Sequence, residues 1–538
     1  MSADPHSHDP NAHTTAARSE HPVDYDAVII GGGFAGSSTA LLLRRWLPSA
    51  RILIVERSQR FERKVGEATV EVSGFFLHRV LGLYDHLSRH HLPKHGLRYW
   101  FSDGGDRGLE EMSEVGPQEM PHVPSFQLDR HVLDQHLLET AAEEGCEVLR
   151  PGKAKAVEFG WPSSTVTLSS TDGDREVTAR WVLDGSGRQS FLARKLGLRV
   201  EVDDHPTAAL WGRWNGSLDL DSDDVLGTDV RQPRLEPVAA SRRLATNHFV
   251  GYGFWCWVIP LSGGQTSIGV VYNKELYQPP GDGTLRERYE RFVRETPGLR
   301  ELVEGADIAG DDFMALRHLP YTAEKYMGRG WALVGDAASF LDPYYSPGLD
   351  HAAMSVFATA RLVEKDLRGD IGGDELQAAV DLHNSDFTGS YRRWLEALYL
   401  GKYELLGDAD LVRCAFLVDT ALYYLGVVTP VYRDIEALGN PVFLPSVPQS
   451  AIAWKTMRLI NRRLVTLARF RRRAGLYGER NLGFRSFSSP FGLGPAAALR
   501  PLRTAAGIWL RLEWQHWTHR LRGKGRDVDM PVPEPSAG

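Results

Sequence analysis

The pattern of apolar and polar positions is clearest between residues 25 and 56. An apolar run at Ala27–Ile30 predicts a short buried strand, and a second run at Ile52–Val55 predicts another. Between them, the sequence from residue 35 to about residue 47 is typical of a helix. We therefore predict a strand–helix–strand unit at the start of the folded chain.

Glycines fill the turn between the first strand and the helix with the spacing G-x-G-x-x-G. Gly31 suits a tight turn, Gly33 lets a pyrophosphate approach the backbone, and Gly36 lets helix and strand pack closely. The helix start offers free N–H groups and the positive end of its dipole to phosphate. Glu56 ends the second strand about 20 residues later, where a carboxylate can accept from ribose hydroxyls. The unit predicts a dinucleotide site.

The same reading continues along the chain. Val72–Leu81 is helical in pattern and leads through a loop to Lys94, and residues 103–125 are rich in Gly, Glu and Pro and predict a loop. Phe126–Glu144 predicts an amphipathic helix. Alternating strands occupy residues 201–310, and helical patterns dominate from about residue 375.

Length and composition fit a soluble globular protein of two or three subdomains, because 538 residues exceed one simple core, with 42% apolar and 24% charged residues. Cys146, Cys256 and Cys414 lie far apart and lack metal-ligand spacing, so we expect a reducing, cytoplasmic compartment, no disulfide framework and no metal site. The first residues are polar and rich in His, and they predict a disordered tail rather than a secretory signal. The most apolar stretch, residues 415–431, contains Asp419 and predicts a buried helix.

Charge is distributed unevenly. Residues 451–526 contain 17 Lys or Arg and only two acids, Glu479 and Glu513, within a chain of net charge −7. Tryptophans and leucines are mixed with the arginines, so this basic tract could meet an anionic membrane, an acidic carrier protein, or the acidic body of the protein itself. No nucleic-acid-binding module accompanies the charge, so nucleic acid is not an expected partner.

Two further segments favour FAD over NAD. Leu183–Arg188 and Val334–Ala338 each read as a strand that ends in a glycine turn. Asp336 in the second turn suits the ribityl hydroxyls, and a helix starting near Gly348 points its N–H groups at the pyrimidine edge of a flavin. There is no second strand–G-x-G-x-x-G–helix unit, so we expect reducing power to arrive from outside.

Together, these three patches resemble the glutathione-reductase-type flavoproteins, in the branch that holds aromatic hydroxylases and flavin-dependent halogenases. The resemblance implies an α/β fold: a Rossmann-like FAD-binding domain with an inserted β-sheet substrate domain and a helical C-terminal region. The expected division is residues 1–23 as a disordered tail, 24–200 and 311–370 as a discontinuous FAD-binding domain, 201–310 as the substrate domain, 371–526 as the helical region, and 527–538 as a second tail.

Three motifs sharpen the resemblance toward the flavin-dependent halogenases. Gly66–Thr69 matches the family's G-E-[AS]-T box, and Trp255–Pro260 matches its G-W-x-W-x-I-P signature except at Phe254, which replaces the leading glycine. Lys94 stands 28 residues after Gly66, where the family places its catalytic lysine. The resemblance implies catalytic roles for Lys94, Trp255, Trp257 and Ser346 and tentative halide binding by Gly348 and Leu349. The expected FAD-binding residues are Gly31, Gly33, Phe34, Ala35, Gly36, Glu56, Arg57, Gly66, Glu67, Ala68, Arg130, Asp184, Gly335, Asp336, Pro343, Gly348 and Leu349.

The family resemblance also implies a reaction. FADH2 from a separate flavin reductase takes up O2 to give a flavin hydroperoxide, halide attack yields hypohalous acid, and Lys94 presents the halogen to an electron-rich aromatic. Burial can lower the pKa of this lysine toward neutrality. The paired tryptophans would separate flavin from substrate, although they would look the same as two core residues in a sheet.

Departures from the family pattern keep alternatives open. Tyr345 stands where tryptophan halogenases carry a Glu, which favours a small phenol or pyrrole, free or tethered to a carrier protein. Pro347 has no N–H to offer a halide. The alternatives are an FAD-dependent monooxygenase or a geranylgeranyl-reductase-like oxidoreductase without halide chemistry, and a flavoprotein that binds a protein partner without acting as an enzyme.

Overall fold

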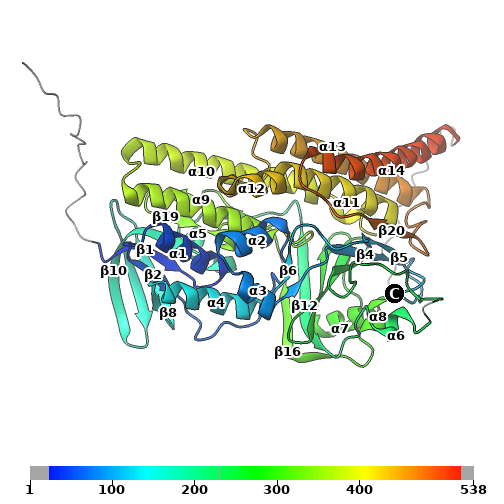
Figure 1. Cartoon of the computed structure of the whole chain (residues 1–538), viewed down its shortest axis with the longest axis horizontal. Coiled ribbons are helices and arrows are strands. Elements are labelled where there is room, and N and C mark those ends of the chain that lie inside the picture. The colour runs from blue at the N-terminus through cyan, green and yellow to red at the C-terminus, as the bar shows by residue number, and fades with distance from the viewer. Residues whose placement is uncertain (1–22, 230, 523–538) are drawn as a thin grey trace, which may run out of the picture.

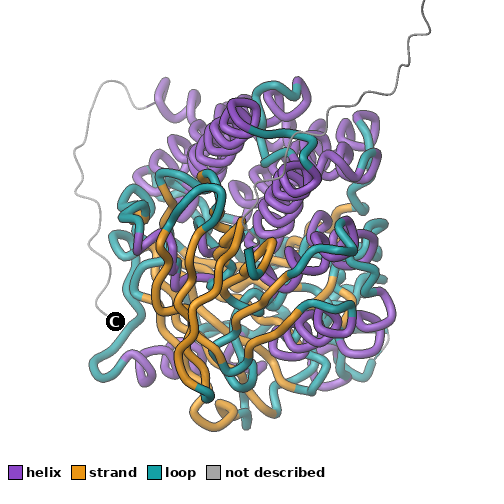
Figure 2. Tube along the Cα trace, turned by 90° about the vertical axis from the view of Figure 1, so that its left-hand side faces the viewer, coloured by secondary structure: helices purple, strands orange, loops and turns teal. Residues whose placement is uncertain are grey.

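The computed structural model describes residues 23–229 and 231–522, so the two predicted tails lie largely outside the described residues. Two sheets stand side by side and a layer of helices covers both (Figure 1). The view from the side shows helices above the strands and further helices beside them at the right (Figure 2). The mixed α/β architecture with a helical C-terminal region is as predicted.

The first sheet is built around the predicted strand–helix–strand unit. Its strand order is β18-β19-β10-β1-β2-β7, with β1 parallel to both neighbours. The N-terminal part of β10 also pairs with β9, and β9 pairs with β8. Helices α1 and α4 pack together beside it, and α9 packs against α1. The bounds are β1 Tyr25–Ile30, α1 Phe34–Trp46, β2 Ile52–Val55, α4 Arg130–Glu143, β7 Glu147–Leu149, β8 Gly152–Glu158, β9 Ser164–Ser170, β10 Gly173–Asp184, α5 Phe191–Lys195, β18 Met327–Gly328 and β19 Trp331–Leu333.

The second sheet takes strands from a wider stretch of the chain than residues 201–310. Its order is β16-β12-β15-β14-β13-β4-β5-β20, so β4 and β5 come from within residues 24–200 and β20 from the helical region. The loop predicted at 103–125 therefore contains a strand. The bounds are β4 Leu97–Phe101, β5 Ser113–Pro117, β12 Thr207–Asn215, α6 Asp223–Leu226, β13 Thr246–Gly251, β14 Phe254–Pro260, β15 Gln265–Asn273, α7 Leu285–Glu295, α8 Leu299–Leu302, β16 Asp307–Leu316 and β20 Arg485–Ser488.

Short elements join the two sheets near Lys94. The predicted helix over 72–81 is present as α2 (Glu71–Phe75) and a π-helical turn, η1 (Phe76–Val80). The expected loop after it contains another helix, α3 (Tyr84–His90). The strands β3 (Leu92–Pro93) and β6 (Phe126–Gln127) then pair, and Lys94 comes directly after β3. Because β6 occupies the first residues of the predicted helix over 126–144, that helix begins four residues late, at Arg130. A second small pair joins β11 (Arg199–Glu201) and β17 (Tyr321–Ala323).

The helical layer consists of α9 to α14. Among the described residues, one helical stretch, Ala409–Arg433, is long and apolar enough to span a membrane, but 78% of its apolar window is buried inside the protein. This agrees with the buried helix predicted for residues 415–431. The bounds are α9 Gly348–Arg368, α10 Gly373–Trp394, α11 Ala409–Tyr423, a π-helical turn η6 Tyr424–Val428, α12 Thr429–Arg433, α13 Pro448–Arg473 and α14 Pro495–Arg522.

Much of the basic tract pairs with the protein's own acids. Arg471 is 1% exposed and donates from Nε to buried Asp408 at 2.8 Å, and two residues earlier Arg469 pairs with Glu404 at 2.7 Å but is 63% exposed. The pairs of this kind are Arg458–Glu396, Arg463–Glu513, Arg469–Glu404, Arg471–Asp408, Arg480–Asp410 and Arg511–Asp410. All of these acids belong to the helical region, so the pairs hold the helical layer together, and Arg485 reaches Glu114 of β5 at 3.9 Å.

These two arginines give a matched test of that role. Arg471→Met should destabilise the fold by about 3–5 kcal/mol, because it leaves the Asp408 carboxylate buried without its charge partner. Arg469→Met should cost less than about 1 kcal/mol, since water solvates the freed groups. The urea midpoint, followed by tryptophan fluorescence, reports both, and equal midpoints for the two variants would contradict the structural role of Arg471.

Candidate active site

The glycine turn between β1 and α1 is packed as closely as the sequence predicts. Gly31 has φ = +99°, in the region that favours glycine. A Cβ on Gly36 would lie 1.8 Å from the carbonyl oxygen of Gly31, so a side chain there would force the helix off the strand. The free N–H groups of α1 therefore face the end of the strand, where a pyrophosphate binds.

Charged side chains gather around Gly33. A Cβ on this glycine would meet Lys64 Nζ at 3.1 Å and an oxygen of Asp134 at 3.3 Å. Asp134 is fully buried and pairs with Lys64 and Arg130. Although burial opposes ionisation, these two cations hold the pKa of Asp134 below its usual range. Lys64 and Asp134 carry no motif that would single them out in the sequence, but they place two cations where phosphate would lie.

The predicted acids at the strand ends both accept from backbone N–H groups of nearby turns. Glu56 accepts from the N–H groups of Gly32 at 2.8 Å and Ser58 at 2.7 Å. Both Asp184 oxygens are taken up by the N–H groups of Ser186 and Leu192, at 2.9 and 2.7 Å, so this carboxylate shapes the turn. Both carboxylates thus shape the backbone around the cofactor site, and their contact with FAD stays a prediction.

Asp336 has the environment expected of a ribityl-binding carboxylate. Its side chain has no hydrogen-bond partner among the described residues, and burial raises its pKa. A cavity of about 280 Å³ lies between Asp336 and the start of α9 and is bordered by Pro347 and Gly348. An unpartnered carboxylate, a helix N-terminus and the glycine turn together fit FAD.

The remaining predicted FAD residues surround the same region. Phe34 and Ala35 open α1, Gly66 has φ = +92° beside the Arg130 guanidinium, and Gly335 has φ = +60° against Ala35. Ala68 forms a bridge to Gln127, Pro343 is half-buried and Leu349 is buried in the first turn of α9. Arg57 is exposed, and its contact with a cofactor stays a prediction.

Glu67 of the G-E-A-T box is held by a partner that sequence reasoning missed. Arg213 on β12 bonds to Glu67 at 2.8 Å and to Asp129 at 3.0 Å, and all three side chains are buried. Burial raises the pKa of Glu67, and Arg213 partly offsets this. The motif residue therefore ties the FAD segment to the second sheet.

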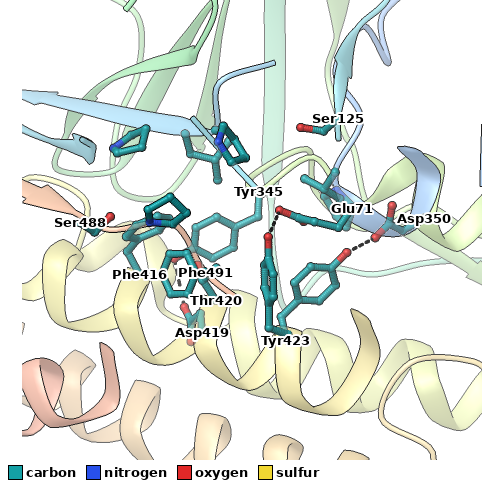
Figure 3. A pocket seen from close by; sticks show the side chains of 18 of the residues that line it. Glu71, Ser125, Tyr345, Asp350, Phe416, Asp419, Thr420, Tyr423, Ser488 and Phe491 are labelled. Carbon is teal, nitrogen blue, oxygen red and sulfur yellow. Dashed lines mark hydrogen bonds between the residues drawn. The ribbon is translucent and has the colours of Figure 1, made fainter. Parts of the chain in front are cut away.

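Lys94 lies in a separate, largely apolar cavity (Figure 3). The side chain is 3% exposed and donates from Nζ to the carbonyl oxygen of Thr69 at 2.8 Å. Burial lowers the pKa of Lys94 to about 8, against the opposing pull of Glu71 and Asp350. Pro347 borders both this cavity and the one beside Asp336, so it stands between the flavin side and the substrate side.

Two carboxylates absent from the sequence prediction face Lys94. Glu71 accepts from the Tyr424 hydroxyl at 2.8 Å, and Asp350 accepts from the Ser73 N–H at 2.8 Å and from the Tyr423 hydroxyl. Glu71 directly follows the G-E-A-T-V segment, and this position was the sequence signal that could have identified it as a site residue. Asp350 and the tyrosines come from distant helices and could be placed only by the fold.

Trp255 and Trp257 share one face of β14 and are buried, with ring centres 5.8 Å apart. They donate to Tyr403 Oη at 2.9 Å and to Ser267 Oγ at 3.1 Å. Neither borders the Lys94 cavity, so a direct contact with substrate is not part of this geometry. Phe254 points to the opposite face and packs on Tyr277 and Phe292, away from both cavities.

The loop before α9 contains two consecutive non-glycine residues in the left-handed region, Tyr345 at φ = +71° and Ser346 at φ = +58°. Such strain is found at functional sites. Tyr345 lines the cavity and donates to Asp419 at 3.1 Å, and Asp419 in turn pairs with buried Lys402 at 2.7 Å. Ser346 is half-buried and does not border the Lys94 cavity, so its catalytic role stays a prediction.

Comparison with known proteins agrees with this site. Residues 24–381 match the FAD binding domain family. Flavin-dependent halogenase chlA of Dictyostelium discoideum is 29% identical over 62% of this chain and 58% of its own length, and monodechloroaminopyrrolnitrin halogenase PrnC of Pseudomonas fluorescens is 23% identical over 71% and 72%. The fold is similar to that of halogenase PltM in complex with phloroglucinol and FAD, with a TM-score of 0.69 and 19% identity over 91% of this chain and 96% of that one.

The chain therefore belongs to the FAD binding domain family, and its cofactor is FAD. The match spans less than two thirds of the Dictyostelium relative, 58% of its length.

The closeness of α1 and β1 can be tested with a single methyl group. Gly36→Ala should weaken FAD binding about 5- to 150-fold, because overpacking of this kind costs about 1–3 kcal/mol. Gly507→Ala is the matched control, since that glycine lies exposed on α14 with nothing near its missing Cβ. Fluorescence titration with FAD measures both, and an unchanged affinity in Gly36→Ala would contradict the proposed cradle.

Proposed function

We propose that the protein halogenates an electron-rich aromatic, a phenol or pyrrole, free or tethered to a carrier protein, by way of hypohalous acid and Lys94. The observation that carries the proposal is a buried lysine in an apolar cavity that shares Pro347 with the flavin-side cavity. Reduced FAD supplies the electrons that activate O2 for oxidation of the halide. Relatives of the chain carry halogenase names, which supports the same reaction.

Lys94 positions and polarises the oxidant. Below its pKa of about 8 the ammonium keeps donors free beyond its bond to Thr69 and can hydrogen-bond the oxygen of hypohalous acid. Hydroxide is then a better leaving group when the aromatic carbon takes the halogen. Burial strengthens this interaction, since little water competes for the ammonium.

The start of α9 supports halide binding nearby. Gly348 and Leu349 occupy its first turn, where N–H groups lack helical partners, and Pro347 contributes none. We place the halide at these two N–H groups, at the positive end of the helix dipole.

The partners and location follow from the same reading. The chain has one glycine-turn unit for a dinucleotide, which supports a separate flavin reductase as the source of FADH2 in the cytoplasm. Many arginines near the end of the chain are already paired with the protein's own acids. The exposed Trp514 and Trp517 of α14 are therefore the surface that we propose for contact with a carrier protein or an anionic membrane.

Replacement of the lysine tests the reaction. With a flavin reductase, NADH, O2 and bromide, Lys94→Met should lower the yield of brominated phenol about 10²- to 10⁴-fold, the usual weight of a proton-donating group. Lys153→Met, at an exposed lysine on β8, should leave the yield unchanged. Mass spectrometry reads the bromine isotope pattern. Oxygenated products that form equally without halide would support the monooxygenase alternative instead.

The pH dependence provides an independent test. Because the protonated form of Lys94 is the active one, the rate should fall as pH rises through about 8. The steady-state rate measured from pH 6 to 10 with saturating reductase reports this limb. A rate that stays constant up to pH 10 would show that Lys94 does not act as the proton donor.

A further inference from the structure

The Lys94 cavity is polar at one end and apolar at the other. Figure 3 shows Glu71 and Asp350 on one side and Phe416 and Phe491 on the other. Most of the lining away from the carboxylates is apolar, including Leu398, Phe416, Phe443, Met457 and Phe491. These apolar residues come from separate segments of the helical layer and of the chain after β20, so this end offers a ligand an extended apolar surface.

The two carboxylates differ in what they can offer a ligand. Asp350 is fully buried, and its two oxygens accept from Ser73 and Tyr423. Glu71 is only partly buried; its Oε1 accepts from the Tyr424 hydroxyl, and apart from its own backbone N–H no other donor among the described residues reaches its carboxylate. One oxygen of Glu71 is therefore available at the polar end, beside Lys94.

We propose that Glu71 binds the hydroxyl of a hydroxyarene and accepts its proton, and that the substrate carries an extended apolar substituent. The inference rests on the proposed halogenation and narrows its substrate class. A pyrrole of one ring would leave the apolar end unfilled. Asp350, Tyr423 and Tyr424 act as positioning residues that hold the carboxylate end in place.

The proposed step is balanced with one molecule of hypohalous acid. The hydroxyl proton moves to Glu71 while a ring carbon forms the bond to the halogen, and the halogen–oxygen bond breaks. The departing hydroxide takes a proton from Lys94 and becomes water. The ring proton then restores Lys94, and Glu71 returns its proton to the substrate oxygen. The ring carbon is oxidised by two electrons and the halogen is reduced by two.

The surroundings of Glu71 raise its pKa, which makes its carboxylate a stronger base. Burial raises the pKa of Glu71, while the Tyr424 hydroxyl and Lys94 lower it. Asp350 on α9, with a pKa raised by burial to about 7, Tyr423 on α11 and Tyr432 on α12 complete the titratable groups around it. A base with a raised pKa is well matched to a phenol.

A matched pair of probes separates binding from chemistry. 4-Pentylphenol and its methyl ether have the same apolar tail, but only the phenol carries a proton for Glu71. Calorimetric titration of the FAD-loaded protein should show the phenol binding at least about tenfold more tightly, the weight of a hydrogen bond to a charged group. Glu71→Leu should remove this preference, and Glu143→Leu, at an exposed glutamate of α4, should keep it. Equal affinity for both probes in the wild type would overturn the inference, as would loss of the preference in Asp350→Asn but not in Glu71→Leu.

Turnover supplies the second readout. Glu71→Gln should lower bromination of 4-pentylphenol about 10²- to 10⁴-fold, while bromamine formed from added taurine, which traps hypohalous acid, stays at the wild-type level. If the wild type forms neither bromamine nor bromophenol, the proposed function fails, and the binding test still judges Glu71 on its own. Full bromophenol yield from Glu71→Gln overturns its role as a base.

Tyr424→Phe covers the case in which the glutamate variants do not fold. The change keeps the ring but removes the donor to Glu71, so the pKa of Glu71 should rise. Because the base works when ionised, the ascending limb of the pH–rate profile should move to higher pH. If the ascending limb does not move, a group other than Glu71 is responsible for it, and the proposed role of Glu71 is overturned.

Discussion

The structure depends on the compensation of charges that are removed from water. Isolated buried ions are strongly unfavourable, so each must find a partner. Glu67 and Arg213 join the FAD segment to the second sheet, and Arg471 and Asp408 join helices within the covering layer. Lys94 lies beside Glu71 and Asp350, where the two sheets and the helical layer meet. Where a pair is complete it holds the fold, and where a group keeps an unused donor or acceptor it is free for chemistry.

Local sequence was sufficient for the parts of the site that depend on backbone geometry. The contact of Gly36 with Gly31 follows from glycine spacing, whereas Lys94 was singled out by the resemblance to the halogenase family. The partners across the cavity could not be obtained this way. Tyr424 lies 353 residues from Glu71, and nothing in its own neighbourhood in the sequence marks it. Glu56 and Asp184 show a related limit, because their place at a strand end does not reveal that N–H groups of nearby turns also bind them.

The departures from the family motifs have different physical consequences. Phe254 packs on the face of its strand that points away from both cavities. The presence of Phe in place of the motif's glycine therefore alters neither cavity. Tyr345 does change the site, since it replaces a carboxylate by a phenol. The negative charge is nevertheless near, because Asp419 accepts from the Tyr345 hydroxyl and is itself balanced by Lys402. The site thus keeps carboxylates around the substrate space while placing them on other elements.

Pro347 borders both cavities, and this has a consequence for how the protein can diverge. A substitution at Pro347 would change the walls of both cavities at once, so it cannot adapt one cavity alone. Substrate range in this chain is therefore expected to drift through the distant apolar lining contributed by the helical layer, at residues such as Phe443 and Met457, which border only the Lys94 cavity. Pro347 thus constrains the wall on the flavin side, whereas the distant apolar lining can change without altering that wall.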